Sequence, residues 1–211
     1  MKPAKIRARK PSPPGRVRDR ILDTACELFY RHGIHAVGVD AIASEAGTNK
    51  MSLYRNFASK EELVAEYLRE QEREYWQVWD AAVTPHAGDA REQIEALFEA
   101  FTRPKPRSAD AQCQMRRGCA LGNAAVEIGG EQPELSAIVH DYKAEIRRRL
   151  RKLARDAGAR EPEQLGDALM LLLEGGYYTR LTFQGNTGPI GSLAAAVRTL
   201  IDAHVGAARA R

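Results

Sequence analysis

Apolar residues recur every three or four positions along most of this 211-residue chain, which is the period of an amphipathic α-helix. The pattern begins beside Arg16 and ends at the helix-stopping pair His32-Gly33, with apolar positions at Val17, Ile21, Ala25, Leu28 and Phe29. The sequence has no alternating runs bounded by hairpin turns. It therefore predicts an all-α fold.

Two short helices are predicted next by local start and stop signals. Residues 39–46 carry apolar side chains on one face and end at Gly47, a residue that commonly terminates helices. The following helix opens with Asn49 as its N-cap and places Leu53 and Phe57 on one side. Isolated helices below about 12 to 15 residues are barely stable in water. We therefore expect both to be held by packing against the first helix.

The same periodicity predicts six further helices, and so about nine in all. The first of the six starts with the capping-box pair Ser59 and Glu62 and ends before the break at Thr84-Pro85. The second is capped by Asp89. The expected ranges are 59–82, 89–101, 119–128, 133–158, 162–183 and 189–208, with a loop over 104–118.

Basic residues are concentrated at the N-terminal end. Residues 1–57 contain 11 Lys and Arg against five Asp and Glu, a net charge of +6, whereas residues 58–211 contain 21 against 23, a net charge of −2. This asymmetry indicates that the N-terminal part contacts a polyanion. Residues 1–15 combine basic residues with four prolines and no acid, which predicts a flexible arm. The arm either adds DNA contacts or is a solvated tail.

The polar side of the third helix is the leading candidate for a functional surface. Packing of Leu53 and Phe57 inward turns the polar side chains outward, and the turn at Gly47 fits a helix-turn-helix junction. A helix with a polar outer surface, on a basic domain, can enter the major groove of DNA. For Asn49, the alternative is that capping is its whole role. The candidate DNA-binding residues are Thr48, Asn49, Lys50, Met51, Ser52, Tyr54, Arg55 and Lys60.

Residues 17–68 resemble the N-terminal DNA-binding domain of the TetR family of transcriptional repressors. The family pattern is matched at Val39, Ile42, Ala43, Ala46, Gly47, Leu53, Tyr54, Phe57, Ser59, Lys60 and Glu61. Two positions depart from it: Gly38 stands where Thr or Ser usually caps the second helix, and Met51 where a small residue is common. The helical remainder, with its segment RGCALGNAAVEIG, is similar to the C-terminal domain of AcrR-like members.

The resemblance implies a domain division and a mode of action. Residues 1–15 would be the arm, 16–60 the helix-turn-helix domain, and 61–211 the ligand-binding and dimerisation domain. The protein would be a cytoplasmic homodimer that binds a palindromic double-stranded DNA operator as a repressor and is released by a small-molecule effector of unknown identity. Activation, or regulation without induction, is the alternative.

Two apolar stripes in the last two helices are candidates for the dimer interface. The resemblance implies that these helices form a four-helix bundle between subunits. The alternative is that both stripes serve the core of the monomer. They comprise Leu165, Leu169, Leu172, Gly176 and Leu181 in one helix, and Leu193, Val197, Leu200, Ile201, His204 and Val205 in the other.

Aromatic residues in the C-terminal part predict a ligand cavity, with core packing as the alternative for each. Gly175-Gly176 interrupts an otherwise strong helix, which indicates close packing or room for a ligand. The candidates for the cavity wall are Trp76, Trp79, Phe98, Phe101, Tyr142, Tyr177, Tyr178 and Phe183, with Asn123 and Glu127 as polar anchors.

Other classes of protein are disfavoured by what the sequence lacks. It has no zinc-protease, nucleophile-elbow or phosphate-loop motif, so we expect neither an enzyme nor a cofactor. The third helix lacks an apolar face broad enough for a membrane surface, no segment is apolar enough to span one, and no signal peptide is evident. RNA binding stays a remote alternative.

Cys26, Cys113 and Cys119 are expected as free thiols in a reducing compartment, the alternative being a Cys113–Cys119 redox pair. His32 and His35 are expected as a surface pair rather than as metal ligands.

Overall fold

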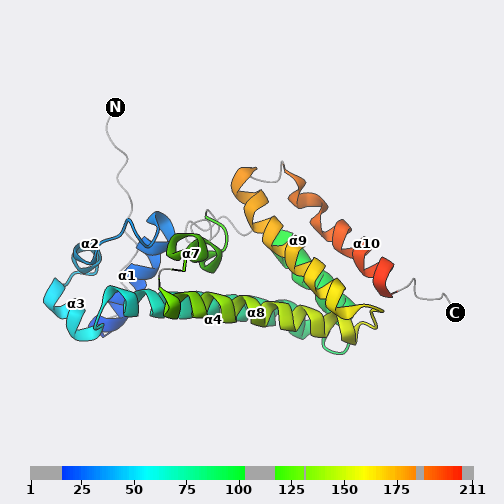
Figure 1. Cartoon of the computed structure of the whole chain (residues 1–211), viewed down its shortest axis with the longest axis horizontal. Coiled ribbons are helices and arrows are strands. Elements are labelled where there is room, and N and C mark those ends of the chain that lie inside the picture. Colours follow the sequence, from blue (N-terminus) through cyan, green and yellow to red (C-terminus); the bar gives the residue numbers. More distant parts are fainter. Residues whose placement is uncertain (1–15, 103–116, 131, 184–187, 206–211) are drawn as a thin grey trace.

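The computed structural model describes residues 16–102, 117–130, 132–183 and 188–205, which form an elongated, all-helical molecule (Figure 1). Within these ranges there are nine α-helices and two short 3-10 segments, and no strand. The all-α prediction is therefore confirmed. The predicted arm at 1–15, the loop over 103–116 with Cys113, and residues 206–211 lie outside the described ranges.

Four helices build the N-terminal end: α1 (Val17–His32), α2 (Val39–Glu45), α3 (Lys50–Asn56) and the start of α4 (Lys60–Val83). Both short helices pack against α1, as expected. Their shared core is formed by Ile21, Ala25, Phe29, Ile42, Leu53, Phe57, Leu63 and Leu68, each at most 2% exposed. Burial of these side chains supplies the stability that seven-residue helices lack on their own.

The C-terminal part consists of the rest of α4 with α5 (Ala90–Thr102), α7 (Ala120–Ile128), α8 (Pro133–Asp156), α9 (Pro162–Thr182) and α10 (Leu193–Val205). Helix α8 packs along α9 and also against α4, α5 and α7, and α10 covers α5 and α9. Helix α4 runs from the N-terminal helices deep into this second part (Figure 1). Helix α4 is therefore one continuous helix shared by the N-terminal and C-terminal parts.

Most helix boundaries agree with the capping signals. Asp89 Oδ1 accepts from the N–H of Glu92 at 2.9 Å, and Ser59 Oγ accepts from the N–H of Glu62 at 3.0 Å. The Glu62 carboxylate accepts from the N–H of Ala58, whereas a regular capping box would use the N–H of Ser59, one residue later. The predicted start of the last helix at residue 189 is wrong: Pro189–Ser192 form a 3-10 turn, and the α-helix begins at Leu193.

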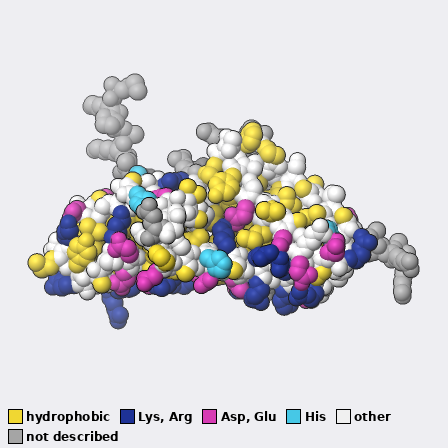
Figure 2. Space-filling model, viewed as in Figure 1, with side chains coloured by type: hydrophobic (Ala, Val, Ile, Leu, Met, Phe, Trp, Pro, Cys, Tyr) yellow, Lys and Arg dark blue, Asp and Glu magenta, His cyan; other side chains and the backbone are white. Residues whose placement is uncertain are grey.

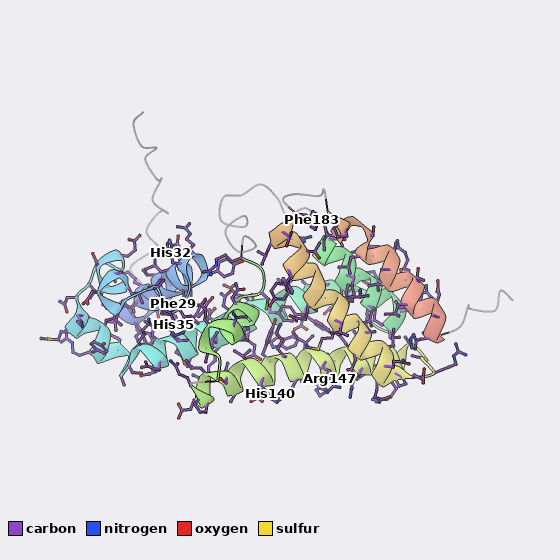
Figure 3. The ribbon with its side chains drawn as sticks, turned by 45° about the horizontal axis from the view of Figure 1, so that its top comes forward. Phe29, His32, His35, His140, Arg147 and Phe183 are labelled. Atoms are coloured by element: carbon purple, nitrogen blue, oxygen red, sulfur yellow. The ribbon has the colours of Figure 1, made fainter. Side chains whose placement is uncertain are left out.

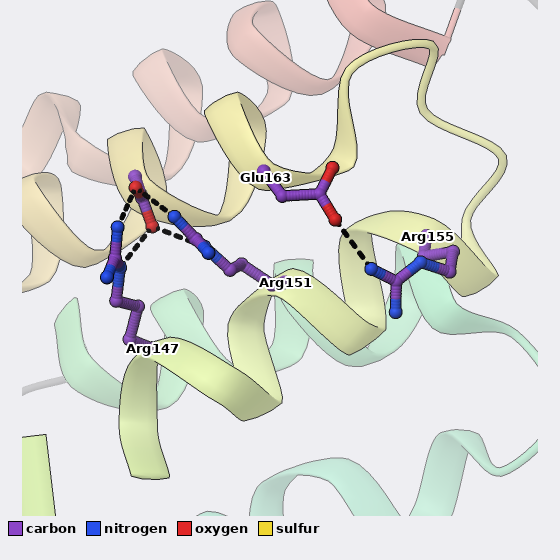
Figure 4. A network of polar contacts seen from close by, with 5 residues as sticks. Arg147, Arg151, Arg155 and Glu163 are labelled. Carbon is purple, nitrogen blue, oxygen red and sulfur yellow. Dashed lines mark hydrogen bonds and ion pairs between the residues drawn. The ribbon is translucent and has the colours of Figure 1, made fainter. Parts of the chain in front are cut away.

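The α8–α9 pair is also joined by a polar network on its surface (Figure 4). The Asp167 carboxylate accepts paired hydrogen bonds from Arg147 at 2.8 and 2.7 Å, and from Arg151 at 2.7 and 2.5 Å. Arg155 binds Glu163 at 2.6 Å. Bidentate Arg–carboxylate pairs fix geometry better than single contacts do. The network therefore links α8 and α9 along their surface.

Candidate nucleic-acid interface and internal cavity

Local hydrogen bonds position α3 at one end of the molecule. Gly47 has a φ of 64°, in the left-handed region that glycine adopts without strain. This lets its N–H reach Ser44 O at 3.1 Å and the N–H of Thr48 reach Ala43 O at 2.9 Å, the pattern of a Schellman cap. Asn49 Oδ1 then caps α3 by accepting from the N–H of Ser52 at 2.9 Å.

The predicted contact residues of α3 lie mostly on its outer surface. Leu53 is fully buried beneath them, while Met51 is 74% exposed and Tyr54 43% exposed. Asn49, Lys50 and Arg55 are exposed as well, and Thr48 and Ser52 are half-buried. The helix therefore presents a polar surface with one apolar side chain, Met51, near its N-terminal end. Figure 2 shows Lys and Arg side chains along the edge of this end of the molecule.

Two of the predicted basic contacts already have partners within the chain. Lys50 Nζ lies 3.1 Å from Asp40 Oδ2 in an exposed ion pair between α3 and α2. Lys60 Nζ donates to Ile34 O at 2.7 Å and lies over the Phe29 ring, 5.9 Å from its centroid. The Lys60 side chain thus secures the loop between α1 and α2. This makes it a weaker candidate for phosphate than the sequence indicated.

A cavity of about 150 Å³ lies among α4, α5, α7, α8 and α9. Aromatic rings dominate its wall: Tyr30, Tyr75, Trp79, Tyr142 and Tyr177. Gln71, Glu74 and Cys119 are polar members of the wall. Three of the predicted wall residues, Trp79, Tyr142 and Tyr177, are therefore brought together at a cavity.

The other predicted ligand contacts are not part of the cavity wall. The Trp76 ring is covered by the Arg149 guanidinium at 3.9 Å, and Phe98 is fully buried. Asn123 Nδ2 donates to Arg117 O at 2.6 Å. The carboxylate of Glu127 contacts the N-terminal helices instead of the cavity. Tyr178 and Phe183 are 50% and 44% exposed, and the Phe101 side chain lies outside what the structure describes.

Tyr75 lines the cavity but is not among the predicted wall residues, although the sequence holds a signal for it. Buried Leu68 and Trp79 lie seven residues before and four residues after Tyr75, so all three share one face of α4. Trp76 is one residue out of this phase. Helical spacing from buried Leu68 therefore identifies Tyr75 as a wall residue. The prediction had named its neighbour Trp76 instead.

The two parts of the molecule are joined through α7. At its C-terminal end, Glu127 Oε2 accepts from the backbone N–H groups of Ile34 at 2.6 Å and His35 at 3.2 Å, and Glu127 O lies 2.7 Å from His35 Nε2. His35 therefore lies on the side of the N-terminal helices that faces α7 (Figure 3). At the other end of the segment, Tyr30 Oη donates to Gly118 O at 3.1 Å. Both Tyr30 and Gly118 line the cavity.

Two family models match the chain. Residues 21–67 match the bacterial regulatory proteins of the tetR family, and residues 129–206 match a tetracycline repressor-like C-terminal domain. The chain belongs to the TetR family of transcriptional regulators. It is a DNA-binding transcriptional regulator and not an enzyme. The first match extends past residue 60, in agreement with the packing of the first turns of α4 against α1.

Relatives of this TetR-family protein match over different lengths. The uncharacterised regulator YxaF of Bacillus subtilis is 28% identical over 82% of this chain and 89% of its own. The repressor KstR2 of Mycolicibacterium smegmatis is 37% identical, but over 43% of each chain. The crystal structure of a TetR-family regulator from Streptomyces coelicolor, SCO4454, has a TM-score of 0.80 and 26% identity over 92% of each chain.

The predicted dimer stripes of this TetR-family chain largely serve the monomer. Leu165, Leu169, Val197 and Ile201 are fully buried, Leu193 is 7% exposed, and Gly176 is buried. Leu172, Leu200, His204 and Val205 are half-buried and Leu181 is 38% exposed. Core packing, the alternative for these stripes, therefore accounts for most of their residues. The buried sides of α9 and α10 pack against each other. They also pack against α8, in the case of α9, and against α5, in the case of α10.

The described residues hold no cluster of three or more His, Cys, Asp or Glu that could ligate a metal. His35 Nε2 lies 2.7 Å from Glu127 O. Cys26 is half-buried, and desolvation raises the pKa of its thiol. Cys119 caps α7, its Sγ accepting from the N–H of Gly122 at 3.3 Å. None of the helices described is long and apolar enough to cross a membrane.

Proposed function

We propose that this regulator binds a palindromic operator as a cytoplasmic homodimer through α3, and that a small molecule in the cavity releases it from DNA. The observation that supports this most directly is the exposed polar surface of α3 on the basic end of the chain. Met51 and Tyr54 project from a helix whose opposite side is anchored by fully buried Leu53. A rigid helix of this kind can enter the major groove with its N-terminal residues against base edges.

The candidate contact residues of α3 differ in which part of the DNA they can reach. Lys50 and Met51 stand in the first turn of α3, where they are suited to guanine and to a thymine methyl group. Tyr54 and Arg55 lie in the second turn and are suited to phosphate. Asn49 and Ser52 share the capping bond, so their first role is to shape the helix. The arm at 1–15 adds further phosphate contacts in this proposal.

The dimer interface is assigned to the outer face of α9 and α10. Leu171 is 74% exposed and Tyr178 50% exposed, and they share one side of α9 with exposed Gly175. Ala195 and Thr199 are exposed on α10. Hydrophobic side chains gather over this region in Figure 2. Dimerisation is needed because one helix-turn-helix makes too few base contacts to select a site in a genome.

Coupling between ligand binding and DNA binding is assigned to α7, which has the cavity at one end and the helix-turn-helix loop at the other. Nine residues span about 13 Å at 1.5 Å each, so α7 can act as a short rigid link. Two dimer geometries are required: one with the reading helices about 34 to 36 Å apart, one turn of DNA, and one with another spacing. An effector shifts the balance only if it binds the two geometries unequally.

The proposal is tested by selecting bound duplexes from a random pool with the full-length protein. Recovery of a palindromic motif with half-sites about one helical turn apart supports it. A pool that stays random at low salt would refute site-specific reading by α3. Repression is proposed because KstR2 is a repressor, but the relative FasR of Mycolicibacterium smegmatis, 39% identical over 40% of this chain, is an activator. A reporter gene placed behind the recovered motif distinguishes the two.

A further inference from the structure

The structure also indicates which side chain connects the cavity to the DNA-binding helices. We propose that Tyr30 of α1 is a positioning residue, which a ligand in the cavity contacts and through which it shifts α1 and α3 against the C-terminal part. This rests on the proposed function, in which the cavity holds the effector and α3 binds DNA. It deepens that proposal by naming the residue at which occupancy of the cavity is sensed.

Tyr30 belongs both to the cavity and to the N-terminal helices. It lies in the cavity wall and is 7% exposed, so packing encloses it. Among the described wall residues it is the one supplied by α1, α2 or α3, since the others come from α4, α5, α8, α9 and residues 118–121. A ligand in the cavity can therefore contact the N-terminal helices directly, at Tyr30.

Three hydrogen bonds join Tyr30 to the segment that precedes α7. Tyr30 Oη donates to Gly118 O at 3.1 Å and accepts from the N–H of Arg117 at 3.3 Å. Arg117 Nη1 donates in turn to Tyr30 O at 3.3 Å. We call these three bonds the Tyr30 clasp. It holds both the side chain and the backbone of one α1 residue against two successive residues of the C-terminal part.

The other side of the clasp is fixed to α7 and α9. Asn123 of α7 donates from Nδ2 to Arg117 O at 2.6 Å. Gly118 has a φ of 74°, and a Cβ on it would lie 3.3 Å from Leu181 Cδ1, so its backbone packs closely against α9. Residues 117–118 therefore move with the C-terminal part. Any shift of α1 against that part must change the Tyr30 clasp.

Movement of α1 carries α3 with it. Phe29, next to Tyr30, and Leu53 of α3 are at most 2% exposed and belong to one core. A ligand shifts the balance between two geometries only if it binds them unequally. Because Tyr30 moves with α1, its place in the wall differs between the two geometries, which gives the ligand this unequal contact. Glu127 lies outside the described wall, so a ligand in the cavity does not contact it.

The test fills the cavity with a side chain, so that no ligand has to be known. Leu97 of α5 lines the cavity and is 6% exposed, so the larger ring in Leu97→Phe extends into the cavity. Amide hydrogen exchange of residues 29–33, at the C-terminal end of α1, is measured in the full-length protein without DNA. We expect Leu97→Phe to change this exchange rate by about 5-fold, the lower end of the usual coupling between two sites. In the Tyr30→Phe background, which keeps the ring and lacks the hydroxyl, the change should fall below about 2-fold, the scatter between independent sites.

Tyr67→Phe is the matched control, since it removes a buried hydroxyl beside α1 but outside the described cavity wall. Tyr67 is 2% exposed, and its ring centroid lies 5.5 Å from that of Phe29. The effect of Leu97→Phe should persist in this background. If Tyr30→Phe does not fold, Asn123→Ala takes its place, because it releases residues 117–118 from α7.

Two results would overturn the inference. One is that Leu97→Phe leaves the exchange of residues 29–33 unchanged. The other is that its effect persists in Tyr30→Phe, which would assign the coupling to α4, the helix that runs through both parts of the molecule.

Affinity for the selected duplex is measured with the same variants. Leu97→Phe should change it by about 5-fold, and by less than about 2-fold in the Tyr30→Phe background. A change in exchange with unchanged duplex affinity would overturn transmission to α3. If the unmodified protein selects no duplex, the proposed function fails, whereas hydrogen exchange in the free protein still decides whether Tyr30 senses the cavity.

Discussion

The Glu127 carboxylate of α7 accepts a hydrogen bond from the backbone N–H of Ile34, 2.6 Å away and 93 residues earlier in the chain. Gly33 makes this approach possible, because a Cβ on Gly33 would lie 2.9 Å from Glu127 Oε2. Lys60 holds the same loop from the other side by donating to Ile34 O. The loop that leads into the helix-turn-helix is thus fastened to the C-terminal part through Glu127, by its carboxylate and by its backbone oxygen.

Removing this carboxylate should loosen the loop. We expect Glu127→Ala to lower the free energy of opening of residues 33–38 by about 1 to 2 kcal/mol, since hydrogen bonds to charged groups contribute about 1.5 to 3 kcal/mol and this one is partly exposed. Amide hydrogen exchange at Ile34 measures it. Val126→Ala, on the same helix and 75% exposed, is the control. Equal protection of Ile34 in both variants would mean that the loop is held by other contacts.

The ion pair between Lys50 and Asp40 should compete with DNA for the lysine. Lys50→Ala is expected to weaken specific binding by about 1 to 3 kcal/mol if the lysine contacts guanine. Asp40→Asn should instead strengthen binding, because it frees Lys50 and removes a negative charge beside the phosphates. Titrations of specific and random duplexes at several salt concentrations measure both. An equal loss on the two duplexes for Lys50→Ala would assign the lysine to phosphate.

Charge placed on the outer face of α9 should separate the subunits. Leu171 is 74% exposed, so Leu171→Lys should leave the fold of the monomer intact while burying a lysine in the proposed interface. Sedimentation should then show monomers at concentrations where the unmodified chain is dimeric. Val126→Lys, at an equally exposed site on α7, should stay dimeric. A dimer that survives Leu171→Lys would place the interface elsewhere.

Two glycines should respond in opposite directions to substitution. Gly38 is the N-cap of α2 with a φ of −86°, and a Cβ there would meet nothing within 4 Å. Gly38→Ser therefore adds a capping oxygen and should raise the free energy of unfolding by a few tenths of a kcal/mol, up to about 0.5. Gly33 has a φ of 93° beside Glu127, so Gly33→Ala should lower it by more than about 1 kcal/mol. Urea unfolding measures both; a stabilising Gly33→Ala would contradict the account of the loop.

The network at Asp167 should contribute to stability above acidic pH. Hydrogen bonds from Arg147 and Arg151 hold the pKa of Asp167 well below its usual range. The folded state therefore favours the ionised form, so this stabilisation is present above the unfolded pKa of about 3.9 and is lost as pH falls further. Because the network lies at the surface, where solvent screens ion pairs, the effect should be small.

Asp167→Asn should accordingly lower the urea midpoint at pH 7 and lower it by less at pH 3, because at pH 3 only part of the stabilisation has been lost. Asp141→Asn is the control, because Asp141 is 81% exposed and contacts only the adjacent His140 among the described ion pairs. A loss of stability that is the same at both pH values would show that the carboxylate acts through shape rather than charge.

Local signals along the chain were enough to predict the helices and the exposed polar surface of α3. Asn49, Ser59 and Asp89 form their caps with residues three positions away, so the signals lie within one turn and can be recognised without a fold. The packing of α2 and α3 followed in the same way, because helices this short have no other source of stability. The 3-10 turn at 189–192 was missed because a single turn of either helix type has the same apolar spacing.

Contacts between distant segments set which apolar faces are internal and where Glu127 and Tyr75 lie. Val197 and Ile201 suit a dimer interface or a monomer core equally well, and the packing of α10 on α5 and α9 selects the core. Glu127 meets Ile34 across 93 residues, and the cavity joins side chains from α1 to α9. Periodicity reports which side of a helix is buried but not which partner buries it, since that depends on contacts between segments that are distant in sequence.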